Sequence, residues 1–270
     1  MRDVLEELTE RRRRDAAMRE ETTPFVEMMR LAEGAPAPRD FAAAFGGEGT
    51  HVIAELKRAS PSEGMIRDAF HPAELAHELE EAGAAALSVL CEPHRFLGGE
   101  EYLKSARRAA GLPILYKDFV STRYQIAAAR AAAADAVLLI AAVLDDESLK
   151  DLLGFAHGLG LSALVETHDE PEIARAVACG ARIVGVNCRN LRDFSTDVSL
   201  LETLVAKIPA DRIRIAESGM HTPEAIRRAK EAGADGFLVG TALMRAASPG
   251  AKLKELTTRL RQGYGGQANN

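Results

Sequence analysis

Short apolar runs recur along the chain, and most of them are separated by segments with helical periodicity. The runs are rich in Val, Ile, Leu and Ala, which is the composition of parallel strands that are buried on both faces. We expect eight strands, at His51–Lys57, Ala85–Leu90, Pro113–Lys117, Ala136–Ile140, Ser162–Glu166, Arg182–Asn187, Arg212–Glu217 and Gly236–Gly240.

The segments between the strands carry helix start and stop signals. Proline stands at the start of two segments, in His71-Pro72 and Thr222-Pro223, a position that proline favours in helices. Glycine directly follows two segments, at Gly180 and Gly233, as it often does at helix ends. We expect helices at Pro72–Ala82, Thr122–Ala134, Asp145–Leu159, Glu170–Cys179 and Thr222–Ala232. Residues 2–20 predict a further, amphipathic helix, with apolar positions at Val4, Leu5, Leu8 and Met18.

Strands that alternate with helices in this way indicate parallel βαβ units. Eight units favour a closed (β/α)8 TIM barrel with an extra N-terminal helical segment, and an open doubly wound sheet is the alternative. We expect an N-terminal helical extension and connector at 1–50, the barrel at 51–262 and a disordered tail at 263–270. The tail contains several glycines and polar residues and has no periodicity.

Composition and charge narrow the class of protein. A chain of 270 residues suits one barrel, and a net charge of −6 argues against nucleic acid as a partner. The most apolar stretch, Ala136–Leu144, is shorter than the roughly 20 residues that span a bilayer, so no membrane partner is expected. Three widely spaced cysteines, Cys91, Cys179 and Cys188, fit free thiols in a reducing compartment, which favours the cytoplasm.

Polar residues end five of the predicted strands. In a barrel the carboxyl ends of the strands meet at one mouth, where barrel enzymes carry out their chemistry. Solvation of each strand end is the simpler alternative, and Glu217 could instead form a structural ion pair. Six convergent groups favour an active site, and they are Glu55, Lys57, Lys117, Glu166, Asn187 and Glu217. Asp118 has the opposite parity to Lys117 and is expected to face the helices.

A second signal lies in the loops that follow the last two strands. Ser218-Gly219 follows the seventh strand, and Gly240-Thr241 follows the eighth. Glycines let backbone N–H groups approach a ligand, and these two loops are the usual phosphate cradle of the fold. The pattern predicts a phosphorylated small-molecule substrate, although tight turns alone would also use glycine.

The loop at 58–71 is longer than most connections of its kind, and it predicts either a lid or a surface excursion. His51 begins a strand, at the end away from the chemistry, and His168 is the only histidine expected near the mouth. Metal-ligand spacing, a Ser–His–Asp arrangement and a dinucleotide fingerprint are all lacking. We therefore expect no metal and no cofactor.

The polar segments also resemble a known family. The run Glu55-Leu56-Lys57-Arg58-Ala59-Ser60-Pro61-Ser62 is similar to the signature of indole-3-glycerol phosphate synthases. The resemblance extends over about residues 2–262. The other matching segments are Leu87–Leu90, Phe96–Gly99, Lys117–Phe119, Leu164–Glu166, Gly185–Leu191, Ala216–Gly219 and Leu238–Gly240.

The resemblance implies a cofactor-independent reaction in tryptophan biosynthesis. The family closes the indole ring of 1-(2-carboxyphenylamino)-1-deoxyribulose 5-phosphate and releases carbon dioxide and water. It implies that Lys117 is the general acid, Glu166 the acid/base partner and Lys57 the partner of the substrate carboxylate. By the same resemblance Glu55 and Asn187 position the substrate and the lysines, and Glu217 contacts a sugar hydroxyl or a lysine.

Binding roles follow from the same resemblance. It implies that Ser60 and Arg189 bind substrate and that Phe96 and Phe119 line the anthranilate pocket. The implied phosphate ligands are Ser218, Gly219, Gly240 and Thr241. Three residues depart from the common family pattern without removing a catalytic group: Tyr116, Thr167 and Cys188. Tyr116 and Cys188 put the shape of the pocket in doubt.

Two other functions remain open at this point. Another phosphate-binding barrel, such as a phosphoribosyl-anthranilate isomerase or a tryptophan synthase α-like lyase, would not need the Glu55–Lys57 pair. A non-catalytic barrel that serves as a subunit or scaffold would not need Lys57, Lys117 and Glu166 together. We expect a monomer or a weak homo-oligomer.

Overall fold

The computed structural model of the chain describes residues 4–188 and 198–261. Two short strands, β2 (Ala59–Ser60) and β3 (Gly64–Met65), pair with each other. The other strands are β1 (His51–Leu56), β4 (Ala86–Leu90), β5 (Ile114–Lys117), β6 (Ala136–Ile140), β7 (Ser162–Thr167), β8 (Ile183–Asn187), β9 (Ile213–Glu217) and β10 (Gly236–Val239).

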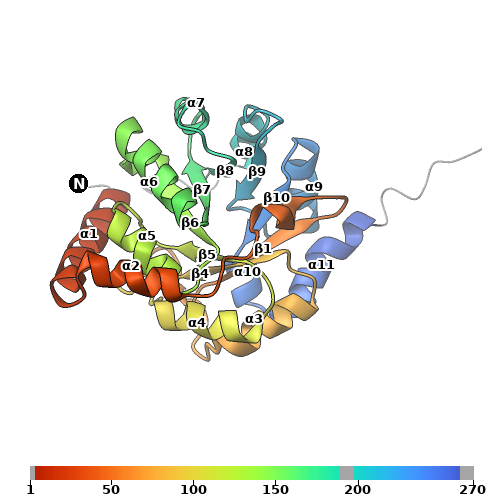
Figure 1. Ribbon diagram of the computed structural model, residues 1–270. Helices are drawn as coiled ribbons and strands as arrows, with labels where there is room; N and C mark the ends of the chain where they lie inside the picture. The colour runs from red at the N-terminus through yellow and green to blue at the C-terminus, as the bar shows by residue number, and fades with distance from the viewer. Residues whose placement is uncertain (1–3, 189–197, 262–270) are drawn as a thin grey trace, which may run out of the picture.

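Helices connect and surround these strands (Figure 1). The α-helices are α1 (Val4–Thr22), α2 (Phe25–Gly34), α3 (Pro72–Glu81), α4 (Glu100–Ala109), α5 (Arg123–Ala131), α6 (Asp146–Gly158), α7 (Glu170–Ala178), α8 (Val198–Val205), α9 (Pro223–Glu231), α10 (Thr241–Met244) and α11 (Pro249–Arg261). Two 3-10 helices are η1 (Ala42–Phe45) and η2 (Ala141–Val143).

The eight long strands form a closed parallel barrel in the order β1-β10-β9-β8-β7-β6-β5-β4. This closure confirms the predicted (β/α)8 barrel with an N-terminal helical segment and excludes the open sheet. Each predicted strand is present, with each end within one residue of its predicted position. Runs of Val, Ile, Leu and Ala predicted the strands correctly because both faces of these strands are buried.

Two predicted helix features are wrong. The prediction extended the helix at α5 to Ala134, but α5 ends at Ala131, and Ala133 adopts a left-handed φ of 64°. Gly83, Gly180 and Gly233 have positive φ at the same step after α3, α7 and α9, so Ala133 performs a turn that glycine usually performs. Met18 was expected on the buried face of the first helix, but 60% of its surface is exposed.

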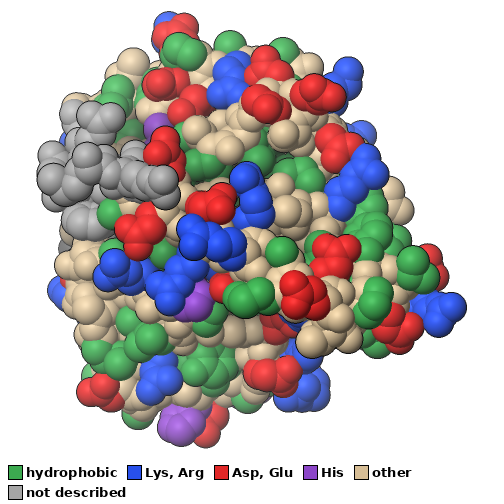
Figure 2. All heavy atoms as spheres, turned by 90° about the vertical axis from the view of Figure 1, so that its left-hand side faces the viewer, with side chains coloured by type: hydrophobic (Ala, Val, Ile, Leu, Met, Phe, Trp, Pro, Cys, Tyr) green, Lys and Arg blue, Asp and Glu red, His purple; other side chains and the backbone are tan. Residues whose placement is uncertain are grey.

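The sequence prediction omitted several elements. The 3-10 helix η1 falls in the predicted connector, and β2 and β3 form a small hairpin in the long loop after β1. Helix α2 packs on α5, at the side of the barrel where α1 also lies (Figure 1). Figure 2 shows this side, where acidic and basic side chains are interspersed.

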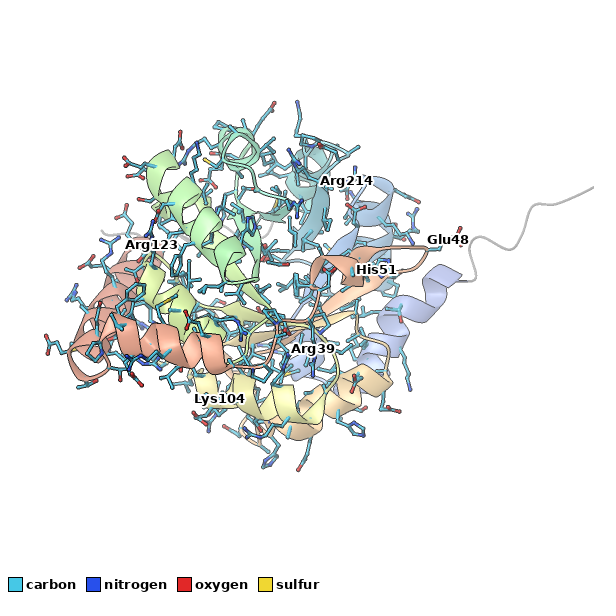
Figure 3. The ribbon with its side chains drawn as sticks, viewed as in Figure 1. Arg39, Glu48, His51, Lys104, Arg123 and Arg214 are labelled. Carbon is cyan, nitrogen blue, oxygen red and sulfur yellow. The ribbon has the colours of Figure 1, made fainter. Side chains whose placement is uncertain are left out.

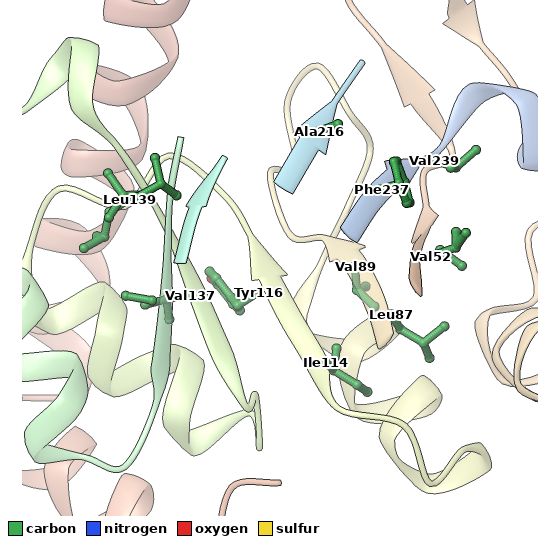
Figure 4. Close-up of a cluster of buried hydrophobic side chains, with 14 of the residues drawn as sticks. Val52, Leu87, Val89, Ile114, Tyr116, Val137, Leu139, Ala216, Phe237 and Val239 are labelled. Atoms are coloured by element: carbon green, nitrogen blue, oxygen red, sulfur yellow. The ribbon is translucent and has the colours of Figure 1, made fainter. Parts of the chain in front are cut away.

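Side-chain alternation along the strands divides the core into two clusters. One cluster lies between strands and helices and includes Val52, Leu87 and Tyr116 (Figure 4). The other fills the barrel interior. Its buried strand residues are Ile53, Ala86, Leu115, Ala136, Leu138, Ile140, Leu164, Ile183, Ile215 and Leu238. Phe41 and Phe45 are buried members of the same interior cluster.

Asp135 anchors the end of the barrel at which the strands begin. Its buried carboxylate accepts hydrogen bonds from the backbone N–H of Arg39 at 2.6 Å and of Ile114 at 2.7 Å. It also pairs with Arg107 at 2.7 Å. Arg39 and His51 lie at this end in Figure 3, so His51 is remote from the strand ends that carry the polar residues, as expected. Within the described ranges, no helix is long and apolar enough to cross a membrane.

Candidate active site

The polar strand ends line one pocket at the mouth of the barrel. Four of these side chains lie two residues beyond a buried apolar residue of the interior, and this spacing keeps them on the inner face. Glu55, Lys117, Glu166 and Glu217 follow Ile53, Leu115, Leu164 and Ile215 in this way, whereas Lys57 follows Glu55 and Asn187 follows Gly185. All six predicted residues line the pocket: Glu55, Lys57, Lys117, Glu166, Asn187 and Glu217. The pocket holds about 1070 Å³, which includes space open to solvent at its mouth.

Lys117 lies at the centre of a charged network. Its Nζ lies 2.7 Å from Glu166 Oε2 and 3.2 Å from Glu217 Oε2. Burial lowers the pKa of Lys117, but the charges of Glu166, Glu217 and Glu55 outweigh burial and raise it above its ordinary value. Lys117 is therefore a stable ammonium group. The direction of its pKa shift could not be predicted from sequence, because it depends on how close these carboxylates lie.

The two carboxylates beside Lys117 differ in their ionisation. Burial opposes the charge of Glu166, but Lys117 and His168 outweigh it and lower the Glu166 pKa. Burial and the neighbouring charge of Glu166 raise the pKa of Glu217 to about 8, against the pull of Lys117. Glu166 is thus the ionised member of the pair at neutral pH, and Glu217 is mostly protonated.

A second pair lies along β1. Lys57 Nζ is 2.7 Å from Glu55 Oε2, and their side chains are 12% and 5% exposed. Gly240 leaves room for this pair, because a Cβ at that position would overlap Glu55 Oε2 and come within 3.0 Å of Lys57 Nζ. Gly185 leaves room for Glu217 in the same way, since a Cβ there would overlap Glu217 Oε1.

The glycine loops contribute backbone groups to the same pocket. Ser218 and Gly219 follow β9 with left-handed φ values of 65° and 75°. A non-glycine residue in this region costs about 1–3 kcal/mol, which suits a site with a function. The Ser218 hydroxyl donates a hydrogen bond to Asn187 Oδ1 at 2.7 Å. Gly240 and Thr241 line the pocket after β10.

The remaining predicted binding residues are also found at the pocket, with one exception. Ser60, Phe96 and Phe119 line it, and the two aromatic rings lie 6.1 Å apart, centroid to centroid. Arg189 lies outside the described residues. The parity of Asp118 directs it away from the pocket centre, where it pairs with Arg12 of α1 at 2.7 Å.

Tyr116 and Cys188, the two departures from the family pattern that bear on pocket shape, both lie outside the pocket. Tyr116 is buried between the barrel and the helices, and its hydroxyl donates a hydrogen bond to Asp118 at 3.2 Å. Cys188 packs in the same layer. Neither lines the pocket, so neither substitution changes its walls directly.

The sequence prediction missed several pocket residues. His221 lines the pocket, whereas His168 was expected to be the only histidine near the mouth. The position of His221 between Ser218-Gly219 and the next helix could have identified it. Val4, Leu5 and Leu8 of α1 also line the pocket, so the first helix covers part of the mouth. Their periodicity predicted a buried face but could not identify the surface that this face covers.

Sequence comparison matches this chain to one enzyme family. The profile of the family described as "Indole-3-glycerol phosphate synthase" matches residues 5–256. A protein of that name from Albidiferax ferrireducens is 45% identical over 260 residues, which cover 95% of this chain and 98% of that protein. One from Campylobacter curvus is 44% identical and covers 90% and 94% of the two chains.

Solved structures show the same fold at lower identity. Thiamine phosphate pyrophosphorylase from Pyrococcus furiosus superposes with a TM-score of 0.60 at 18% identity, covering 80% of this chain and 97% of that one. The fold alone is common to many activities, so the sequence match decides the family. With a family profile that spans most of its length and relatives above 40% identity, this chain belongs to the indole-3-glycerol phosphate synthase family.

Proposed function

We propose that the pocket converts 1-(2-carboxyphenylamino)-1-deoxyribulose 5-phosphate to indole-3-glycerol phosphate, carbon dioxide and water. The observation that carries this proposal is the contact of one buried ammonium group, Lys117, with two carboxylates that differ in ionisation. A site that holds one stable acid and one ionised base can move the protons that ring closure and dehydration require.

Lys117 is the general acid in this proposal. An aromatic carbon of the substrate attacks the ketone carbon, a new carbon–carbon bond forms, and the carbonyl electrons move to oxygen. The Lys117 ammonium donates its proton to that oxygen. The substrate carboxylate then leaves as carbon dioxide, and the electrons of the broken bond return to the ring system.

Glu166 is the base for the later steps. Loss of the new hydroxyl as water needs a proton for the leaving oxygen and removal of a proton from the ring that becomes indole. Glu166 is ionised and hydrogen-bonded to Lys117, so it can accept a proton and pass one to the amine. Asn187 and Glu217 orient the substrate and Lys117 beside it.

The substrate's other charges suit the remaining walls. Lys57 pairs with the substrate carboxylate, and Glu55 holds Lys57 in place. The phosphate binds the backbone of Ser218-Gly219, where two left-handed residues form a concavity of N–H groups, and the backbone of Gly240-Thr241 after β10. Phe96 and Phe119 form an aromatic contact for the anthranilate ring, with Ser60 and Arg189 as further ligands.

Product formation by the purified protein tests the proposal. We expect indole absorbance to appear from the carboxyphenylamino deoxyribulose phosphate without added metal or cofactor. Turnover of phosphoribosyl-anthranilate instead would favour an isomerase. Tight binding of the carboxyphenylamino deoxyribulose phosphate, with no turnover of either compound, would favour a non-catalytic barrel and overturn the proposal.

Several coarser predictions accompany this function. We propose the division into an extension at 1–50, a catalytic barrel at 51–262 and a tail at 263–270, which lies outside the described residues. A cytoplasmic location, a monomer or weak homo-oligomer, and the lack of a nucleic-acid partner stay predictions.

A further inference from the structure

His168 lies behind Glu166, outside the pocket. It directly follows β7, and its imidazole ring lies between two carboxylates. Nε2 is 3.5 Å from Glu166 Oε1, and Nδ1 is 3.2 Å from Glu172 Oε2. The backbone N–H of His168 donates to the same oxygen of Glu172 at 2.8 Å. His168 is not among the residues that line the pocket, so we do not expect it to contact substrate.

Each oxygen of Glu166 lies near a nitrogen, Oε2 within hydrogen-bond distance and Oε1 at an ion-pair distance that is too long for a well-formed hydrogen bond. Oε2 accepts from Lys117 Nζ at 2.7 Å, and Oε1 faces the His168 ring. A neutral imidazole has one N–H and one lone pair, so it would direct a lone pair at one of the two carboxylates. Only the doubly protonated ring offers an N–H to each. Its side chain is 21% exposed, which keeps water from screening the contact fully.

We propose that His168 is a positioning residue that holds Glu166 as an oriented, ionised base from outside the pocket, and that Glu172 holds His168. This proposal rests on the proposed function only in assigning Glu166 its role as the base. The chain Glu172–His168–Glu166 connects the first turn of α7 to the reacting end of β7. It fixes the Glu166 oxygen that Lys117 does not bind.

The charges around this chain support an imidazolium. Among the described residues, the titratable groups that face Glu166 are Lys117 from β5, Glu217 from β9 and His168 itself. Those that face His168 are Glu166 and Glu172. Burial lowers the pKa of His168, but the two carboxylates outweigh it and raise that pKa to about 10.

Nitrogen-15 NMR of the histidine rings tests the protonation state without any substrate. At pH 8 we expect the His168 ring to carry protons on both nitrogens, whereas an ordinary imidazole is neutral there. In Glu172→Gln the ring should lose its second proton at lower pH than in the wild type. A His168 ring that is neutral at pH 8 in the wild type would overturn the proposal, whatever reaction the enzyme catalyses.

Kinetics of His168→Gln test the positioning role. We expect kcat to fall about 10-fold, a fraction of what an acid/base group itself contributes. KM should change little because the side chain does not contact substrate. In the Glu166→Gln background the same substitution should cause no further loss, since His168 acts only through Glu166. An equal loss in both backgrounds would contradict the proposal.

Two comparisons keep these results interpretable. His157→Gln replaces an exposed histidine on α6 and should leave kcat unchanged. If His168→Gln proves unstable, Glu172→Gln provides the second variant, with a smaller loss of kcat expected in the same direction. A wild-type protein that fails to turn over the substrate would refute the proposed function, while the NMR result would still decide the protonation of His168.

Discussion

At the scale of single residues, alternation along each strand separates the chemistry from the packing. Lys117 faces the pocket centre, Tyr116 is buried towards the helices, and the Asp118 carboxylate at the pocket edge pairs with Arg12 of α1. Because the side-chain period of a strand is two, this separation could be predicted from sequence. The ionisation of the groups could not, since it depends on distances between residues from different strands.

The two carboxylates beside Lys117 should respond differently to neutralisation. Because burial and Glu166 raise the pKa of Glu217 to about 8, Glu217→Gln removes little charge at pH 7 and should keep kcat within about 10-fold of the wild type. Glu166→Gln removes an ionised base and should lower kcat at least ~100-fold. Steady-state kinetics at pH 7 compare the two variants. Equal losses would show that the assigned ionisation states are wrong.

The raised pKa of His168 also predicts how stability depends on pH. The two carboxylates raise that pKa from its usual 6.5 to about 10 in the folded protein. The stabilisation is therefore fully present below pH 6.5 and is lost as the pH rises from 6.5 to 10. The difference in free energy of unfolding between wild type and His168→Gln, measured in urea, should shrink over this window. A difference that stays constant from pH 6 to pH 10 would contradict the assignment.

At the scale of elements, apolar runs predicted the strands, and residues at the helix ends predicted several of the helices. Asp145 and Thr222, the first residues of two predicted helices, accept hydrogen bonds from the first turns of α6 and α9, and Asp169 does the same for α7. Helices α2 and α4 begin without a side-chain cap, so the sequence offered a weaker start signal. The two-residue strands of the β2–β3 hairpin are too short to leave a periodic pattern.

The end of β10 and the end of β1 must fit together at the pocket. Gly240→Ala would place a methyl group on the Glu55–Lys57 pair, and we expect kcat/KM to fall about 10-fold or more as the pair moves. Gly154→Ala is the matched control, because an added methyl at that position of α6 meets no atom within 4 Å. It should preserve activity and raise stability by about 0.5–1 kcal/mol. Unchanged activity in Gly240→Ala would show that the pair tolerates displacement.

At the scale of the whole molecule, the N-terminal helix completes the mouth of the barrel. Leu5 and Leu8 line the pocket, and Arg12 binds both oxygens of the buried Asp118 carboxylate. The sequence indicated an amphipathic helix, but contacts more than 100 residues apart in the chain decide where such a helix packs. Its role in the pocket therefore became evident only from the structure.

Arg12→Ala tests this connection between helix and barrel. The variant leaves Asp118 buried without its cation, which should cost about 3–5 kcal/mol of unfolding free energy. A loosened α1 should also raise KM, because Leu5 and Leu8 would no longer be held at the pocket. Arg13→Ala, at a residue whose side chain is 52% exposed, should change stability by less than about 0.5 kcal/mol. Similar stability and KM in both variants would contradict the anchoring role.

The central claim is that the Lys117 ammonium group donates the proton that drives ring closure. The rate of indole-3-glycerol phosphate formation by wild type and by Lys117→Ala, measured side by side from indole fluorescence at saturating substrate, tests it most directly. We predict that the variant folds, binds substrate and loses at least ~100-fold in turnover. A Lys117→Ala enzyme that forms product at the wild-type rate would contradict the claim.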